Sequence, residues 1–329
     1  MLGLDLICQA QHRLRGRVHR TPLVHASALR QRLGAAAYLK LECLQKTGSF
    51  KPRGAFNKLL TLTDDERRRG VVAVSGGNHA QGVAFAARTL GISAVLCMPA
   101  STPRNYLDAT RGYGAEIVLT PDIRAAFAEV ERLRAAGRVL VHPFDDPLVA
   151  AGQGTIGLEI LEDLPQVTHV YVSIGGGALI SGIAAAIKAI KPSVRIIGVE
   201  TEGADAMARS LAAGRLIELP AITSIARTLG APRVSEFTLT HVRDLVEEVV
   251  VVSDAVTVEA LFWLLQRTKY LLEPAAACCL AAADFHRPKR HADDHVILLA
   301  CGGNVAVEDL CTWRERFSNP EAPATVPKE

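Results

Sequence analysis

Residues 170–190 read Val-Tyr-Val-Ser-Ile-Gly-Gly-Gly-Ala-Leu-Ile-Ser-Gly-Ile-Ala-Ala-Ala-Ile-Lys-Ala-Ile. The run Val170–Ile174 is rich in β-branched residues and predicts a buried strand, and the alanine-rich run Ala178–Ile190 predicts a helix. Between them, Gly175–Gly177 predicts a tight turn. Such a turn presents free N–H groups and the positive end of the helix dipole, which suits a phosphate. A purely structural turn is equally compatible, since neither Walker A nor GxGxxG spacing is present.

The same alternation of strand and helix continues on both sides of this stretch. Further strands are expected at Val71–Ser75, Ser93–Met98, Glu116–Leu119, Val139–His142, Arg195–Glu200 and Val296–Ala300. Helices are expected at Ala80–Leu90, Pro103–Gly112, Ile123–Ala136 and from Gln153 onward. This pattern predicts an α/β fold of parallel sheets with helices on both faces, and such folds bind ligands at the carboxyl ends of their strands.

Composition limits the function classes that remain. The chain has 329 residues, and a single core stops growing at about 250–300 residues, so two lobes are expected. A net charge of +3 and 5% aromatic residues argue against nucleic-acid binding. We expect no membrane span, because no apolar run reaches about 18 residues. Seven cysteines without zinc-type spacing, and no export signal, lead us to expect a reduced, cytoplasmic protein.

The stretch Lys46-Thr-Gly-Ser-Phe-Lys51-Pro-Arg-Gly-Ala carries the chemistry. Lys51 lies between Phe50 and Pro52, and a partly desolvated lysine has a lowered pKa and can form a Schiff base. A surface position is the simpler alternative for either Lys46 or Lys51. A reactive lysine together with a phosphate cradle indicates pyridoxal phosphate, whose chemistry uses both.

These motifs resemble the fold-type II pyridoxal-phosphate enzymes, which are similar to the tryptophan synthase β chain, and among them the threonine/serine dehydratase and serine racemase family. The resemblance covers nearly the whole chain through four motifs in the same order, at residues 46–55, 75–82, 173–179 and 301–304. It implies two lobes, each with a mainly parallel sheet flanked by helices. The large, cofactor-binding lobe would comprise residues 1–63 and 148–329, and the small lobe residues 64–147.

The resemblance also implies roles for the matched positions. Lys51 would bind the cofactor and remove the Cα proton, Asn78 would bond the ring hydroxyl, and Cys301 would face the pyridine nitrogen. A neutral thiol at that nitrogen favours β-elimination over transamination. The alternative is that Cys301 is an ordinary buried cysteine without a role in the site. The other cofactor contacts would come from Phe50, Gly175, Gly176, Gly177, Ala178 and Leu179. The substrate carboxylate would be held by the segment that contains Ser75, Gly76, Asn78 and His79.

The activity that the resemblance implies is elimination of water from a β-hydroxy amino acid, by default L-threonine or L-serine, giving a 2-oxo acid and ammonia. Three alternatives stay open: a dehydratase for hydroxyaspartate, phenylserine or a hydroxyectoine-derived compound; a serine racemase; and a non-catalytic pyridoxal-phosphate sensor. Racemases of the family have a second serine where this sequence has Gly76, which favours the dehydratase. The expected partners are a small amino-acid substrate and a second copy of the chain.

Three positions depart from the family pattern. Arg227 replaces an acidic residue near the substrate loop; arginine clamps a second carboxylate well, and a solvent-facing arginine is the equal alternative. Ala178 replaces a fourth glycine, which is tolerable if its φ is negative. We expect no metal, because Ala206 occupies the third ligand position of the family's cation site, and only Glu200 and the Ala204 carbonyl are left as candidates.

Overall fold

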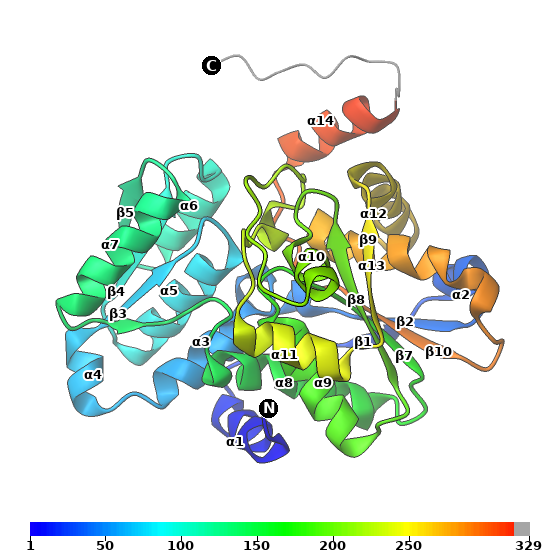
Figure 1. Ribbon diagram of the computed structural model, residues 1–329, viewed down its shortest axis with the longest axis horizontal. Helices are drawn as coiled ribbons and strands as arrows, with labels where there is room; N and C mark the ends of the chain where they lie inside the picture. Colours follow the sequence, from blue (N-terminus) through cyan, green and yellow to red (C-terminus); the bar gives the residue numbers. More distant parts are fainter. Residues whose placement is uncertain (319–329) are drawn as a thin grey trace.

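The computed structural model describes residues 1–318 and contains two sheets (Figure 1). The larger sheet has the order β1-β2-β10-β7-β8-β9, and all its pairs are parallel except β1 with β2. Its strands are β1 (Leu23–His25), β2 (Ala36–Lys40), β7 (His169–Ser173), β8 (Arg195–Thr201), β9 (Glu248–Val252) and β10 (His295–Leu299). The apolar strands are covered by helices that contact this sheet or one another, namely α8 (Pro147–Asp163), α9 (Ala178–Ile190) and α13 (Pro274–Phe285).

The smaller sheet is parallel throughout and has the order β5-β4-β3-β6. Its strands are β3 (Val71–Val74), β4 (Ala94–Pro99), β5 (Glu116–Thr120) and β6 (Val139–Leu140). Helix α5 (Asn78–Leu90) covers one part of it, and α7 (Ile123–Ala135) contacts all four of its strands. All four strands lie within residues 64–147, the range expected for the small lobe, whose boundary stays a prediction.

Helices fill the remaining connections between the strands. Those associated with the smaller sheet are α3 (Lys51–Leu60), α4 (Asp64–Arg69) and α6 (Arg104–Gly112). Those associated with the larger sheet are α1 (Leu4–Leu14), α2 (Ser27–Leu33), α10 (Ala206–Ala213), α11 (Glu236–Leu245), α12 (Asp254–Thr268) and α14 (Val307–Ser318).

The strand–turn–helix unit at residues 170–190 is confirmed as β7, a glycine turn and α9. Two expectations were wrong in detail. Helix α8 begins at Pro147 rather than Gln153, because Asp146 caps it and Oδ1 of Asp146 accepts the Leu148 N–H at 2.8 Å. Helix α5 begins at Asn78 rather than Ala80, which brings its first turn to the end of β3.

Helix α3 lies between the two sheets and contacts both α5 and α8. Its Phe56 and Leu59 belong to the hydrophobic core of the smaller sheet. Its first residue is Lys51, so the lysine lies where the two halves of the molecule meet. Within residues 1–318, no helix has the length and apolar character needed to cross a membrane.

Candidate active site

The loop that follows β10 holds Lys51 in place. Ser49 forms an isolated β-bridge with Gly302, and the Phe50 N–H donates to the Cys301 carbonyl at 3.1 Å. Two motifs that are about 250 residues apart in sequence are therefore joined by backbone hydrogen bonds immediately before Lys51.

The amine of Lys51 is withdrawn from water. Burial lowers the pKa of Lys51 to about 8, although the neighbouring groups Cys301 and Glu273 act to raise it. Its Nζ lies 4.9 Å from the centre of the Phe50 ring. A Cβ added to Gly82 would lie 3.0 Å from the Lys51 Cβ, so α5 packs directly against the base of this side chain. The environment therefore makes a far larger fraction of this amine uncharged and nucleophilic near neutral pH than in an exposed lysine, and the uncharged form predominates above about pH 8.

The glycine turn leads from β7 into α9 beside Lys51. Gly177 has a φ of +100° and precedes the first helical residue, Ala178. A Cβ added to Gly176 would lie 1.9 Å from a ring carbon of Phe144, so only glycine fits there. Ala178 itself is helical and has no positive φ, which makes its methyl group acceptable. The N–H groups of this turn and of the first turn of α9, which we call the glycine cradle, have no intrahelical partner and suit an anion.

Cys301 lies in the same cavity as this cradle and is buried. Burial raises the pKa of the Cys301 thiol well above its usual value, so the group is an uncharged thiol at physiological pH. The Ser173 hydroxyl donates to its sulfur at 3.5 Å. Both residues line the cavity together with Phe50 and Lys51.

The first turn of α5 forms another side of the cleft. Ser75, Gly76, Gly77, Asn78 and His79 line it together with Lys51. The helix begins at Asn78, so the N–H groups of its first turn have no intrahelical partner and suit a carboxylate. The Gly77 N–H donates to the Ser75 hydroxyl at 3.0 Å, and this bond stabilises the turn that immediately precedes α5.

The His79 side chain is neutral. Its Nε2 lies 2.9 Å from the Val141 carbonyl, which can only accept, so Nε2 carries the proton. Burial lowers the pKa of His79 to about 3, and the charge of Lys51 adds to this effect. An imidazole in this state brings no positive charge to the cleft.

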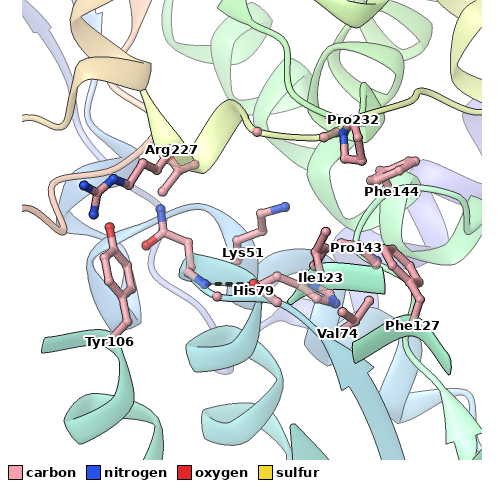
Figure 2. Close-up of a pocket in the computed structure, with 18 of the residues that line it drawn as sticks. Lys51, Val74, His79, Tyr106, Ile123, Phe127, Pro143, Phe144, Arg227 and Pro232 are labelled. Atoms are coloured by element: carbon pink, nitrogen blue, oxygen red, sulfur yellow. Dashed lines mark hydrogen bonds between the residues drawn. The ribbon is translucent and has the colours of Figure 1, made fainter. Parts of the chain in front are cut away.

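The cleft has a polar and an apolar side (Figure 2). Arg227 and Tyr106 lie on one side of Lys51, and Arg227 is exposed. The other side is formed by Val74, Ile123, Phe127, Pro143, Phe144 and Pro232. Among residues 1–318, no Asp or Glu lines this outer part of the cleft, so its charged groups are the cations Lys51 and Arg227.

The two metal candidates lie elsewhere. Glu200 lies against the first turn of α10, where its oxygens accept the N–H groups of Met207 and Ala208 at 2.9 and 2.8 Å. Burial raises the pKa of Glu200 to about 8. Neither Glu200 nor Ala204 lines the cleft, and the described part of the chain contains no cluster of three or more His, Cys, Asp or Glu residues that could hold a metal.

Sequence reasoning missed several lining residues. Glu273 is the most important, because it is a buried carboxyl group that accepts from Asn78 Nδ2 at 3.0 and 3.1 Å. Its only sequence signal is a charged residue between the apolar pair Leu271-Leu272 and Pro274. The other missed residues are Tyr106, Phe144 and Thr228.

This donor set fits pyridoxal phosphate. The glycine cradle suits the phosphate, the desolvated amine of Lys51 suits the aldehyde, and Phe50 offers an apolar face beside it. Asn78 and Cys301 offer polar groups in the same cavity. The assigned role of each residue stays a prediction.

Comparison with known proteins gives the same result. Residues 14–302 match the family model described as "Pyridoxal-phosphate dependent enzyme". The L-threonine ammonia-lyase of Geobacter sulfurreducens is 44% identical over 318 residues, which cover 96% of this chain and 79% of that protein. The structure of maize serine racemase superposes with a TM-score of 0.90 at 38% identity, covering 95% of this chain and 97% of that one. The structure of a threonine deaminase from T.th. gives a TM-score of 0.87 at 40% identity, covering 92% and 99%. The chain therefore belongs to the family of pyridoxal-phosphate dependent enzymes.

Proposed function

We propose that this enzyme is a dehydratase that eliminates water from L-threonine or L-serine and releases a 2-oxo acid and ammonia. The observation that carries the proposal is the position of Lys51, a lysine of lowered pKa that lies between the glycine cradle and the first turn of α5. Relatives named L-threonine ammonia-lyase and L-threonine dehydratase support it.

The residues of the cleft have different roles in this reaction. The bound cofactor supplies an electron sink for the charge that develops at Cα. Lys51, uncharged above pH about 8, accepts the Cα proton. The N–H groups at the start of α5 hold the substrate carboxylate near Asn78. Phe144 and Pro143 give the cleft an apolar wall beside Lys51.

The racemase alternative requires a second base on the opposite face of the substrate. Gly76 lies in the cleft and offers no such group. A side chain there would also meet the Thr102 hydroxyl, whose Oγ1 lies 2.8 Å from the position of an added Cβ. Incubation with L-serine should therefore give pyruvate without D-serine, which chiral chromatography would detect.

The direct experiment measures 2-oxo acid release by the cofactor-loaded protein. We expect 2-oxobutyrate from L-threonine and pyruvate from L-serine, and loss of at least about a thousandfold in rate for Lys51→Ala, because the base and the covalent anchor are both removed. A wild-type protein that binds the cofactor but releases neither product would rule out these two substrates.

A second candidate substrate class is a β-hydroxy amino acid with a side-chain carboxylate, such as hydroxyaspartate. It is favoured by Arg227, which lies at the cleft without any acidic group of residues 1–318 lining the outer part beside it. If Arg227 clamps such a carboxylate, Arg227→Leu should raise the KM for hydroxyaspartate about tenfold or more and change that for threonine less than about threefold. Equal changes for both substrates would exclude this role.

A further inference from the structure

A hydrogen-bonded chain crosses the cleft from the lysine motif to Glu273. Asn304 Nδ2 donates to the Thr47 carbonyl at 2.7 Å and to Asn78 Oδ1 at 2.8 Å. A backbone carbonyl only accepts, so the bond to Thr47 fixes which end of the Asn304 amide faces it. Asn78 must then present its oxygen to Asn304 and its NH2 group to Glu273.

Local backbone geometry supports this chain of bonds. Thr47 is one of the two non-glycine residues with positive φ in residues 1–318, at +63°, and its carbonyl accepts from Asn304. A Cβ added to Gly48 would lie 2.5 Å from Asn304 Oδ1. A Cβ added to Gly302 would lie 2.6 Å from Glu273 Oε1. Glycine at both places leaves the space that the two polar side chains occupy.

Glu273 is the titratable residue at the end of this series of hydrogen bonds. Its Oε1 accepts from the Thr228 hydroxyl at 3.2 Å and lies 4.0 Å from the Cys301 sulfur. It immediately precedes α13 but caps none of its N–H groups with its side chain. The carboxyl group therefore faces the cofactor cavity rather than its own helix.

The charges around Glu273 are few. Among residues 1–318, Lys51 is the only cation that acts on it, and the thiols of Cys43 and Cys301 and the phenol of Tyr106 face it as uncharged groups whose pKa values are raised. Burial raises the pKa of Glu273 to about 7, against the hydrogen bonds from Asn78 and Thr228 and the charge of Lys51.

We propose that Glu273 is a positioning residue of the cofactor site. Glu273 takes up a proton when pyridoxal phosphate binds, and its uncharged carboxyl group then orients Asn78. Pyridoxal phosphate brings a phosphate dianion into a cavity that Glu273 also lines, and two negative charges in a buried cavity repel each other. A neutral carboxyl group avoids this repulsion and can donate as well as accept. The inference rests on the proposed cofactor site.

The test measures proton uptake by calorimetry in two buffers of different ionisation enthalpy. The probe is pyridoxine 5′-phosphate, which carries an alcohol in place of the aldehyde and so cannot react with Lys51. Above about pH 7, wild-type protein should take up protons on binding. Its affinity relative to Glu273→Gln should fall by up to about tenfold per pH unit, since one proton is linked to binding. Below about pH 6 the two should converge, because Glu273 is then protonated in both states.

Two further variants make the result specific. Glu273→Asp keeps a titrating carboxyl group and should retain the proton uptake that Glu273→Gln loses. Thr228→Val removes a hydrogen bond that lowers the pKa of Glu273, so its uptake should begin at higher pH, and this half-buried position offers a test even if Glu273→Gln does not fold. Equal uptake in wild type and Glu273→Gln, or in wild type and Thr228→Val, would overturn the inference. Failure of pyridoxal phosphate itself to bind the wild type would instead contradict the proposed function.

Discussion

Lys51 shows how one residue acquires its chemistry from its surroundings. An exposed lysine is almost fully charged at neutral pH and is a poor nucleophile. Here the first turn of α3, the approach of Gly82 and the Phe50 ring shield the amine, and burial lowers the pKa of Lys51 to about 8.

The lowered pKa of Lys51 predicts how the cofactor-free protein captures pyridoxal phosphate. Only the neutral amine attacks the aldehyde, so the rate at saturating cofactor should rise about tenfold per pH unit up to about pH 8 and then level off. Stopped-flow absorption measures this rate. A rate that still rises between about pH 9 and 10 would mean that the amine is solvated like a surface lysine.

Site residues could be predicted from the sequence only where they belong to a recognisable motif. Lys51, Asn78 and Cys301 stand in distinctive runs, and the structure brings all three into one cavity. Glu273 was not predicted, because its burial depends on contacts with Asn78 and Gly302 that no local sequence pattern indicates. Arg227 lines the cleft and is exposed, and its function stays a prediction.

At the scale of elements, the turn from β7 into α9 is the part that sequence predicted best. Three consecutive glycines between a β-branched run and an alanine-rich run leave few other conformations. The start of α8 was harder to predict, because the capping side chain of Asp146 precedes the apolar pattern. Strand β9 and the antiparallel pair β1 and β2 were not expected at all. Strand β1 has only three residues and β2 contains no β-branched residue, so neither shows a strong strand pattern.

The glycine turn predicts a contrast between two neighbouring positions. Gly176→Ala should weaken pyridoxal-phosphate binding at least about tenfold, because the added methyl group overlaps the Phe144 ring and overpacking costs about 1–3 kcal/mol. Ala178→Gly, at a helical position, should change the affinity less than about threefold. Equilibrium titration of the cofactor absorbance measures both. Equal effects at the two positions would show that the turn does not form the phosphate site.

At the scale of the whole molecule, a buried charge network joins segments that are far apart in the sequence. Arg53 donates to Glu42 at 2.8 Å and to Glu159 at 2.6 Å, and Lys40 donates to Glu159 at 2.6 Å. The network connects α3, which carries Lys51, with β2 and α8. Long-range pairing of this kind could not be predicted from the sequence, where these four residues stand in unrelated segments.

Removal of Arg53 should destabilise the fold as a whole. Arg53→Ala leaves the buried Glu42 carboxylate without its ion-pair partner and Glu159 with Lys40 alone, which costs about 3–5 kcal/mol in the free energy of unfolding. Urea denaturation measures this value. The control is Arg68→Ala, which breaks an exposed pair with Asp65 and should cost less than about 1 kcal/mol. Similar losses in both variants would mean that the buried network contributes no more to the free energy of unfolding than an exposed ion pair.

We expect the cleft between the two sheets to bind pyridoxal phosphate through Lys51. Borohydride reduction of the cofactor-loaded protein, followed by peptide mass spectrometry, tests it most directly, because reduction makes the bond between cofactor and lysine permanent. We predict the cofactor adduct on Lys51 and none on Lys46, five residues earlier in the same motif. An adduct on Lys46 or another lysine, with Lys51 unmodified, would exclude Lys51 as the residue that binds the cofactor.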